Sequence, residues 1–529
     1  MSQLSSWIEE GRAVLGIEYG TTRIKAVLIG PDHAPIASGA CVWENVLEGG
    51  YWTYHEADIW RGLQAAYAEL KQDVLRQYGV RLTRLGALGF SAMMHGYLPF
   101  DREGRLLVPF RTWRNATTGP AADALTRLFD FHIAQRWTIA HLYQAILNGE
   151  EHVARIDHLT TLEGYVHWKL SGRRAVGVGE GSGIVPTDLS TNDYDQRMVD
   201  AFERLIAPYG YPWRLRDILP KVLPAGADAG SLTPEGTLLL DPTGELLPGT
   251  PMCPPEGDAE TGLMATNCVA PGQGCVSAGT SIFSMVVLEK LLSRPYPEVD
   301  IVMTPTGLPV AMVHCSNCTS DINAWAGMLR EAAQSLGFEP DMGQIYTAMF
   351  RAAMRGAPDC GGIVTCGYLS GENIARLKEG RPMLVRSPEN RIAFADLSRS
   401  LILSAMATLK LGMGVLDEEH VTIERLIGHG GFFKTPGTAQ SLLASALQTP
   451  VSVMETAGEG GAWGMALLAA YRVWHAPGET LERYLAERVF RGAKLVEERP
   501  VPEDVASITA YTERFRAMLE LERDAVRLL

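Results

Sequence analysis

The sequence has little cysteine, no tract of positive charge and no very long apolar run. Its 8 cysteines in 529 residues are too sparse for a disulfide framework, so we expect reduced thiols. The formal net charge of −14 disfavours a nucleic-acid partner, because such partners are bound by clustered Lys and Arg. The N-terminus lacks a basic flank before an apolar segment, and no run approaches the roughly 18 residues of a membrane span. We therefore expect a cytoplasmic protein that binds neither nucleic acid nor a membrane.

The length and the proline distribution predict two domains. A chain of 529 residues is too long for a single hydrophobic core, since cores stop growing near about 250 to 300 residues. Prolines and glycines crowd the segment 220–258, which disfavours regular structure and indicates a junction between two halves. We place the domains at residues 1–246 and 247–529. Strand and helix patterns alternate over residues 14–93, which predicts an α/β fold.

Two similar turns lie about half a chain length apart. In each, short β-branched runs flank a Gly-Thr turn, which predicts a β-hairpin whose N–H groups and hydroxyls can bind phosphate oxygens. Neither a G-x-x-x-x-G-K-[ST] motif nor a G-x-G-x-x-G motif after a strand occurs, so P-loop and Rossmann sites are disfavoured. The predicted phosphate-binding residues of the two turns are Gly20, Thr21, Thr22, Gly279, Thr280 and Ser281.

Asp258 stands in the segment PPEGDAETG, shortly before the second turn. Phosphoryl transfer to an alcohol needs a carboxylate that accepts the hydroxyl proton close to the transferred phosphate. Asp258 could be this base. The presence of Asp at this position is explained equally well by an Asx turn beside Gly257, which would give Asp258 a purely structural role.

These motifs resemble those of the FGGY carbohydrate kinases, which belong to the actin, Hsp70 and hexokinase superfamily. The resemblance runs over almost the whole chain, and its most specific part is GGFFKTPGTAQSLLASALQTPV, which begins at Gly430. The segment GIEYGTTRIKAVL fits the first phosphate hairpin of the family, with Lys25 at the position of the family lysine. The resemblance implies two actin-like (ribonuclease H-like) ATPase domains that flank a central cleft, with the two hairpins on opposite sides of the ATP phosphates.

The resemblance also implies a nucleotide site and a metal ion. Asp258 would be the catalytic base, and the loop of Gly430, Gly431 and Lys434 would hold the adenosine end of ATP. Mg2+ would be reached through water from residue 18, where this chain has Glu18 and the family has Asp. The longer side chain moves the carboxylate by about one bond length, which bears on metal affinity because Mg2+ demands near-octahedral geometry. Ser445 likewise replaces a family Asp in the adenosine-side motif.

A third set of matches concerns the sugar. SAMMHG resembles the S-G-Q-M-H-G segment of the xylulokinases, which implies that Met94 and His95 line the sugar site. TWRNATT resembles their W-N-D segment, with Trp113 as the matching aromatic residue. Met93 replaces the family Gln, and Asn115 and Ala116 stand near the position of the family carboxylate, so the identity of the sugar is the open question.

From this resemblance we expect a sugar kinase that uses ATP and Mg2+ and phosphorylates the terminal hydroxyl of a ketopentose. D-xylulose is the first choice of substrate. Alternatives are another ketose or a polyol, such as L-ribulose or D-ribulose, and a catalytically silent regulator that binds sugar and nucleotide. The expected partners are the small-molecule sugar and ATP, and a homodimer is compatible with the sequence.

Several other residues have simpler structural interpretations. We expect Glu180 either to touch the sugar or to lie in a glycine loop, and the terminal segment ITAYTERFRAMLELERDAVRLL to form a packing helix. The Cys315 and Cys318 pair could hold zinc, but buried small side chains are preferred because no second close pair follows. We expect three histidines at the surface and four tryptophans in core or interface positions: His55, His152, His158, Trp7, Trp43, Trp52 and Trp60.

Overall fold

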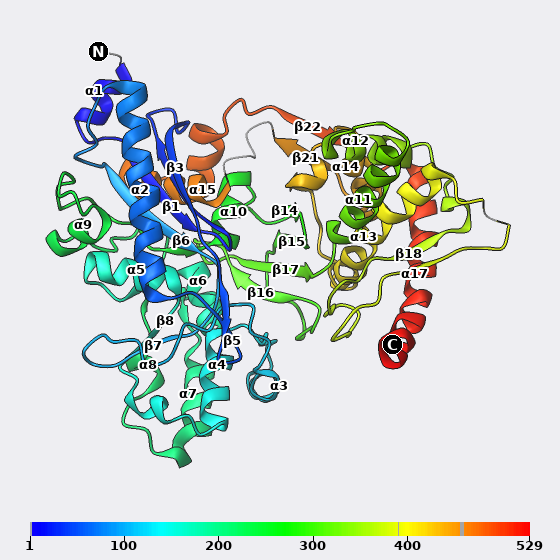
Figure 1. Cartoon of the computed structure of the whole chain (residues 1–529). Coiled ribbons are helices and arrows are strands. Elements are labelled where there is room, and N and C mark those ends of the chain that lie inside the picture. Colours follow the sequence, from blue (N-terminus) through cyan, green and yellow to red (C-terminus); the bar gives the residue numbers. More distant parts are fainter. Residues whose placement is uncertain (1–2, 390, 455–459) are drawn as a thin grey trace. The chain divides into compact units, whose positions relative to one another are not determined.

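The structure is a computed structural model, and it describes residues 3–389, 391–454 and 460–529. Helices and strands alternate along the chain (Figure 1), which confirms the predicted α/β class. The α-helices are α1 (Gln3–Glu9), α2 (Glu56–Tyr78), α3 (Gly119–Phe129), α4 (Thr138–Leu147), α5 (Leu162–Ser171), α6 (Val178–Ile184), α7 (Gln196–Ile206), α8 (Leu215–Ile218), α9 (Pro234–Leu240), α10 (Asp258–Thr266), α11 (Thr319–Ser335), α12 (Met342–Ala353), α13 (Phe394–Glu418), α14 (Ala439–Leu447), α15 (Gly460–Trp474), α16 (Leu481–Tyr484) and α17 (Pro502–Leu528).

The strands form two main sheets and several short pairs. In chain order they are β1 (Val14–Tyr19), β2 (Arg23–Ile29), β3 (Pro35–Val42), β4 (Val46–Glu48), β5 (Tyr51–Thr53), β6 (Ala87–Ala92), β7 (Leu98–Phe100), β8 (His158–Thr160), β9 (Ala175–Gly177), β10 (Thr187–Asp188), β11 (Asp193–Tyr194), β12 (Lys221–Leu223), β13 (Glu256–Gly257), β14 (Gln273–Ala278), β15 (Ile282–Val287), β16 (Asp300–Met303), β17 (Pro309–Cys315), β18 (Val364–Cys366), β19 (Met383–Val385), β20 (Arg425–His429), β21 (Val451–Met454) and β22 (Leu495–Glu498).

The first sheet has five strands in the order β13-β6-β1-β2-β3. β1 pairs with β2 in antiparallel fashion and with β6 in parallel fashion, as expected for a hairpin followed by a helical crossover. The apolar, β-branched sequences VLGIEY and RIKAVLI are almost entirely buried because helices cover both faces of this sheet. The predicted first hairpin, the following helix and the strand near residues 85–93 are therefore all confirmed.

Two helices from distant parts of the sequence cover opposite faces of the first sheet (Figure 1). Ile24 and Tyr19 point toward α2: the Tyr19 hydroxyl donates to the Ile59 carbonyl over 3.4 Å. Gly16 points the other way, and a Cβ atom added there would lie 2.2 Å from the Ala462 carbonyl oxygen of α15. The backbones of β1 and α15 are thus packed too closely for any side chain at residue 16.

The second large sheet repeats the hairpin arrangement. Its seven strands follow the order β16-β17-β15-β14-β20-β21-β22, with β14 antiparallel to β15 and parallel to β20. Five helices lie close together in space in this part of the structure (Figure 1): α11, α12, α13, α14 and α17. The predicted second hairpin and the terminal helix are confirmed by β14–β15 and α17.

Contacts divide the chain into two compact units that are not continuous in sequence. One comprises Met1–Val269, Ile301–Val310 and Glu459–Gly492, and the other comprises Ala270–Asp300, Ala311–Gly458 and Ala493–Leu529. Asp258 falls in the first unit, because α10 packs closely against α15. The boundary at residues 246 and 247 stays a prediction for the domains of the family.

One helix of the described residues, α13, is long and apolar enough to cross a membrane by length and composition alone. However, 78% of its most apolar 18-residue window is buried among other parts of the protein. Burial of this extent is typical of a core helix, and α13 contacts α12, α14 and α17.

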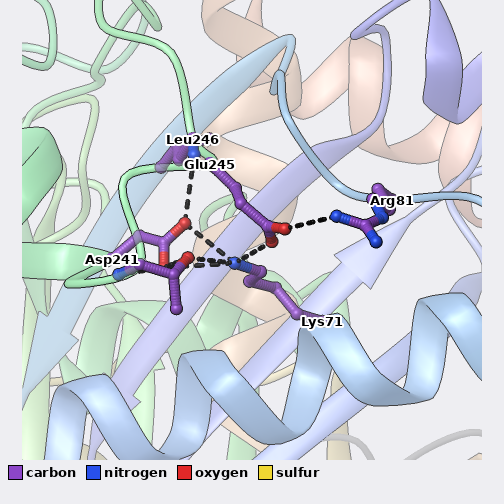
Figure 2. Close-up of polar contacts among 6 residues, drawn as sticks. Lys71, Arg81, Asp241, Glu245 and Leu246 are labelled. Carbon is purple, nitrogen blue, oxygen red and sulfur yellow. Dashed lines mark hydrogen bonds and ion pairs between the residues drawn. The ribbon is translucent and has the colours of Figure 1, made fainter.

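An ion-pair network with Asp241 buried at its centre connects α2 to the loop after α9. Figure 2 shows the Lys71 ammonium between the carboxylates of Asp241 and Glu245, at 2.9 Å and 2.7 Å. Arg81 binds the far side of Glu245 at 2.9 Å, and the Leu246 N–H donates to Asp241 over 3.0 Å. Burial raises the pKa of Asp241, but hydrogen bonds from the Thr243 hydroxyl and Lys71 outweigh this effect and hold it below its ordinary value.

Two of the three histidines expected at the surface are buried instead. His55 is exposed, but His158 and His152 keep only 1% and 5% of their surface accessible. The His158 ring donates a hydrogen bond from Nδ1 to the Ile218 carbonyl over 3.1 Å, and His152 binds the Tyr97 hydroxyl over 2.8 Å. The surface prediction for His152 and His158 was wrong. Each follows an acidic residue in the sequence, but in the fold an aromatic side chain that is not adjacent in sequence packs against each ring.

Candidate functional site

The first hairpin carries an acidic and a basic residue directly opposite each other. Glu18 on β1 pairs with Lys25 on β2, one step before the turn. The turn is closed by a hydrogen bond from the Gly20 N–H to the Arg23 carbonyl over 3.0 Å. This geometry confirms the tight turn expected from the Gly-Thr-Thr sequence, while its role in phosphate binding stays a prediction.

The carbonyl groups of this turn are held from behind by two stacked aromatic residues. The Trp43 indole N–H donates to the Gly20 carbonyl over 2.7 Å, and the Tyr54 hydroxyl donates to the Thr21 carbonyl over 2.6 Å. The Trp43 and Tyr54 rings stack with centroids 3.9 Å apart. Because its carbonyls are bound on the protein side, the turn is rigid before any ligand arrives. Thr22 is exposed at the tip.

The side chain of Glu18, on β1, packs against the first residues of α15. A Cβ atom added at Gly461 would be 2.2 Å from Oε1 of Glu18, so the carboxylate occupies the space that this glycine leaves. Burial, and after it the Asp258 carboxylate, raise the pKa of Glu18 to about 7, against the lowering effect of the Ala462 backbone N–H and Lys25. The two carboxylates and Lys25 therefore belong to one electrostatic cluster.

Asp258 is the first residue of α10 and follows the short strand β13. Its Oδ1 atom accepts a hydrogen bond of 3.2 Å from the Met94 backbone N–H. Desolvation by surrounding protein atoms raises the pKa of Asp258, and the Met94 N–H lowers it. The residue is nevertheless exposed to water. Water access and the hydrogen bond favour the ionised form, which is the form that can accept a proton.

His95 lies beside Met94 in a strained and crowded position. Its φ angle is 69°, in the left-handed region, and its ring stacks on Trp137 with centroids 5.8 Å apart. A Cβ atom added at Gly183 of α6 would lie 2.6 Å from Nδ1 of His95. The Glu180 carboxylate accepts the His95 backbone N–H over 3.3 Å. Glu180 is fully buried and supports the loop that carries His95, and its contact with the sugar stays a prediction.

Trp113 lies in the segment that follows Arg111, and Arg111 forms an isolated bridge with Tyr97. Trp113 is half-buried and packs against the core of the first unit. Asn115, near the position of the family carboxylate, instead fixes the β4–β5 hairpin: it accepts from the Trp52 N–H over 2.8 Å and donates to the Trp52 carbonyl over 2.9 Å. This position is structural in the present chain.

The second hairpin is held from behind by the start of α11. The Gly279 N–H donates to the Ser281 carbonyl over 2.9 Å, which closes the turn. The Thr319 hydroxyl and N–H both donate to the Gly279 carbonyl, at 2.8 Å and 3.1 Å, and the Cys318 N–H donates to the Thr280 carbonyl over 3.0 Å. Thr280 is exposed, as Thr22 is in the first hairpin.

The glycine loop of the adenosine-side motif lies next to this second hairpin. Gly430 has a φ angle of 103°, and a Cβ atom added there would be 2.4 Å from the Ala278 carbonyl oxygen. Gly431 opens a short 3-10 turn, and Lys434 follows it with an exposed side chain. The fold thus brings Gly279, Gly430 and Gly431 together within the second unit.

Ser445 has a structural role in this chain, because it binds the residue that precedes α17. Its side chain is fully buried, and its hydroxyl oxygen accepts the Val501 N–H over 3.0 Å at the start of α17. The replacement of the family Asp by Ser445 therefore coincides with a contact that anchors the terminal helix. The segment GEGGAWG begins at Gly458 and Glu459, which lie outside the described residues, and α15 follows it.

The fold brings the predicted residues together in two groups. Glu18, Lys25 and Asp258 gather near Met94 and His95 in the first unit, and the second hairpin and the glycine loop gather in the other. Sequence reasoning missed the support from Trp43 and Tyr54, because Trp43 was expected only in a core or interface role. It also missed three buried glutamates near Glu180, namely Glu163, Glu256 and Glu260.

The cysteines remain separate thiols, as expected for all eight. Cys315 and Cys318 are both buried, and burial raises the pKa of each thiol. Over residues 3–389, 391–454 and 460–529, no group of three or more His, Cys, Asp and Glu residues is placed to hold a metal ion. A Mg2+ ion that keeps water and phosphate oxygens as ligands needs only one or two carboxylates, and Glu18 stays the residue predicted to supply one.

A surface groove of about 360 Å³ runs beside α11 in the second unit. Its lining residues are Asp321, Ala324, Trp325, Met328, Pro382, Met383 and Leu384. This set contains no residue predicted for the site, so we assign the groove no part in it.

Comparison with known proteins gives matches over most of the chain. Residues 13–243 match the N-terminal domain, and residues 274–473 the C-terminal domain, of the FGGY family of carbohydrate kinases. Glycerol kinase 1 of Pseudomonas aeruginosa is 23% identical over 314 residues, which is 56% of this chain and 58% of that protein. Xylulose kinase of Haemophilus influenzae is 21% identical over 436 residues, 79% of this chain and 82% of that protein.

Solved structures show the same fold. The xylulose kinase of Rhodospirillum rubrum superimposes with a TM-score of 0.77 at 18% identity, covering 96% of this chain and 99% of that chain. The chain spans little more than half the length of the glycerol kinases it matches, 58% in one case and 54% in another. At these identities the likeness establishes the fold and leaves the substrate open.

Proposed function

Since the chain belongs to the FGGY family of carbohydrate kinases, we propose that it transfers the γ-phosphate of ATP to the terminal hydroxyl of a ketopentose. The ketopentose that we propose first is D-xylulose. The observation that carries the proposal is the position of Asp258. Its carboxylate is exposed to water, stands at the first turn of α10 and is hydrogen-bonded to Met94, which belongs to the predicted sugar-binding segment. A base placed beside the acceptor sugar is what transfer to a hydroxyl needs.

In the proposed reaction Asp258 accepts the proton of the sugar hydroxyl while the hydroxyl oxygen attacks the γ-phosphorus of ATP. The new bond joins this oxygen to phosphorus, the bond from phosphorus to the β-γ bridging oxygen breaks, and ADP leaves. The rigid arrangement of Asp258 and Met94 supports the reaction by fixing where the proton is taken up.

The two hairpins and the glycine loop supply the proposed ATP contacts. Thr21 and Thr280 offer hydroxyls and N–H groups to phosphate oxygens, and Lys25 supplies positive charge next to Glu18. Gly430, Gly431 and Lys434 are proposed to receive the adenosine end. Glu18 would hold Mg2+ through water, and the ion would neutralise charge on the β- and γ-phosphates when bound.

The identity of the acceptor is the finer part of the proposal. The Met94 and His95 segment favours a xylulokinase-like sugar, and the likeness to the xylulose kinase of Haemophilus influenzae extends over 79% of this chain. Glycerol remains a second acceptor to consider, because a glycerol kinase matches 56% of the chain at 23% identity. L-ribulose and D-ribulose complete the set that should be compared.

The test is ADP release from Mg-ATP by purified protein, first without sugar and then with D-xylulose, L-ribulose, D-ribulose or glycerol at equal concentration. We expect strong stimulation by D-xylulose. Stimulation by another acceptor alone would overturn the D-xylulose assignment and keep the kinase. Binding of ATP and sugar without product from any acceptor would favour the silent regulator instead.

A further inference from the structure

The turn of the second hairpin is oriented by the backbone at the start of α11. The Cys318 N–H binds the Thr280 carbonyl, and the Thr319 N–H and hydroxyl bind the Gly279 carbonyl. In a planar trans peptide, the carbonyl of one residue and the N–H of the next point in opposite directions. The N–H groups of Thr280 and Ser281 are therefore directed away from α11, toward the side on which the proposed phosphate would bind.

The segment that precedes α11 is held by a buried glutamate. Glu372 is fully buried, and its Oε2 atom accepts from the Ser316 N–H over 2.9 Å. The same atom accepts from the Asn317 N–H over 3.3 Å and from the Asn317 side-chain amide over 3.1 Å. Burial raises the pKa of Glu372 to about 7, against the lowering effect of the Asn317 and Ser316 donors. Because a carboxyl group keeps an acceptor oxygen in both protonation states, these contacts need an oxygen atom at this position and not a charge.

The Asn317 side chain connects the start of α11 to the segment that carries Glu372. Its Oδ1 atom accepts from the N–H groups of Leu369 and Ser370, over 3.0 Å and 3.1 Å. Its amide nitrogen donates to the carbonyls of Ser370 and Gly371, each over 3.4 Å, besides its bond to Glu372. Asn317 is only 5% exposed. Both ends of the side-chain amide are therefore used to fix one segment against the other.

The segment that binds Asn317 is itself fixed to the core of the second unit. Tyr368 is buried, and its hydroxyl is hydrogen-bonded to the Thr408 hydroxyl of α13 over 2.7 Å. The backbone of Glu372 forms an isolated bridge with Leu377, through N–H donors at 2.8 Å and 3.0 Å in the two directions. Hydrogen bonds thus form a continuous path from the buried helix α13, through Asn317, to the turn of the second hairpin.

We propose that Asn317 and Glu372 are positioning residues for ATP, which hold residues 316–319 and, through them, the turn of the second hairpin. In this proposal neither side chain touches ATP or the acceptor, and both act through the carbonyls of Gly279 and Thr280. Removal of the Glu372 oxygen would leave three N–H donors without an acceptor, so the segment would have to move to satisfy them. The link to ATP rests on the proposed function, whereas the ordering of the hairpin does not.

The first test is kinetic and compares two replacements of Glu372. Glu372→Ala removes the acceptor oxygen, so kcat/KM for ATP should fall by roughly 10 to 100-fold, while the KM for the stimulating acceptor stays the same. Glu372→Gln keeps an oxygen for the same donors and should restore most of the lost activity. A general loss of stability would distinguish neither ATP from the acceptor nor Ala from Gln. Glu331→Ala, at an exposed position on α11, is the control.

Asn317→Asp tests the same connection without opening a cavity, and it carries the test if Glu372→Ala does not fold. The new side chain keeps the shape and the Oδ1 acceptor. However, it replaces the donating amide with an oxygen that faces Glu372 and the carbonyls of Ser370 and Gly371. We expect the same selective loss of kcat/KM for ATP.

The second test uses neither ATP nor an acceptor. Hydrogen exchange of the folded protein, followed by mass spectrometry, measures how often each segment opens. In Glu372→Ala and in Asn317→Asp, peptides that cover residues 274–287 and 316–319 should exchange faster by roughly tenfold. Peptides that cover residues 14–29, the first hairpin, should exchange as in the unchanged chain. Glu372→Gln should resemble the unchanged chain over both hairpins.

The outcomes separate this inference from the proposed function. Unchanged exchange over residues 274–287 in both Glu372→Ala and Asn317→Asp would overturn the positioning of the hairpin. Equal losses for ATP and for the acceptor, or a Glu372→Gln variant as impaired as Glu372→Ala, would overturn the role toward ATP. Faster exchange of the hairpin in the variants, together with no ADP release by the unchanged chain with any acceptor, would support the positioning and overturn the proposed function.

Discussion

The Met94 backbone N–H and the Asp258 carboxylate are joined by a hydrogen bond of 3.2 Å, although the two residues are 164 positions apart in the sequence. One belongs to the segment after β6, and the other begins α10 after β13, the strand that pairs with β6. The parallel pairing of these strands therefore places the predicted base at the predicted sugar segment.

Replacement of Asp258 by Asn should abolish most turnover and leave sugar binding in place. The amide keeps the shape of the side chain but cannot accept the hydroxyl proton, so kcat should fall by roughly 10² to 10⁴-fold. ADP release and calorimetric titration with the stimulating sugar would measure the two effects. Asp123→Asn, at an exposed position on α3, is the control. Near-normal turnover in Asp258→Asn would remove Asp258 from the role of base.

Replacement of Glu18 by Gln should raise the Mg2+ requirement. A carboxylate that contacts the ion through water supports it from the outer shell, and loss of such support weakens metal affinity or activity by roughly 10 to 100-fold. The half-saturating Mg2+ concentration for ADP release would be measured at saturating sugar. Glu44→Gln, at an exposed position before β4, is the comparison. An unchanged Mg2+ dependence in Glu18→Gln would show that Glu18 serves only to pack against α15.

Gly16→Ala should destabilise the first unit. The added methyl group would lie 2.2 Å from the Ala462 carbonyl oxygen and 2.3 Å from the Ala466 nitrogen, and backbone atoms cannot turn away as a side chain can. Overpacking of this kind costs about 1 to 3 kcal/mol and occasionally more. Urea unfolding would measure it.

Gly262→Ala is the matched control for this change. It lies on α10, and nothing stands within 4 Å of its added methyl group. Because Ala favours a helix over Gly by about 0.5 to 1 kcal/mol, this variant should be slightly more stable than the unchanged chain. A loss of stability of the same size in both variants would contradict the close approach of β1 and α15.

The hairpins and the main helices could be predicted because their signals are local. Short β-branched runs around Gly20 and Gly279 specify two hairpins, and apolar residues at helical spacing specify α2 and α17. The burial of Glu163 and Glu256 could not be predicted, because it depends on how distant elements pack in space. The role of Trp43 in supporting the turn could not be predicted either, because the sequence does not determine which carbonyl group its indole N–H will bind.

Lys71→Met should destabilise the attachment of α2 to the loop after α9. The Asp241 side chain is only 3% exposed, so removal of the ammonium leaves a buried carboxylate with fewer partners, at a cost of about 1 to 3 kcal/mol. Arg81→Met should cost about 0 to 1 kcal/mol, because the Arg81 side chain is 74% exposed. Urea unfolding of both variants at neutral pH would compare them, and equal losses would contradict the ranking.

The same variant should change the acid response. The folded-state pKa of Asp241 lies below its ordinary value, so its contribution to stability is present above the unfolded pKa and is lost as pH falls through the folded one. Lys71→Met removes part of that depression. Its unfolding free energy should therefore fall less steeply than that of the unchanged chain below the unfolded pKa of about 3.9.

The dependence of β1 on α15 has a consequence during synthesis. β1 leaves the ribosome early, but the helix that covers its Gly16 face comes about 445 residues later. At roughly 5 to 20 residues per second, that interval lasts tens of seconds. During this interval the growing chain exposes an apolar sheet face, so the nascent protein should bind holdase chaperones until residues 460–474 emerge.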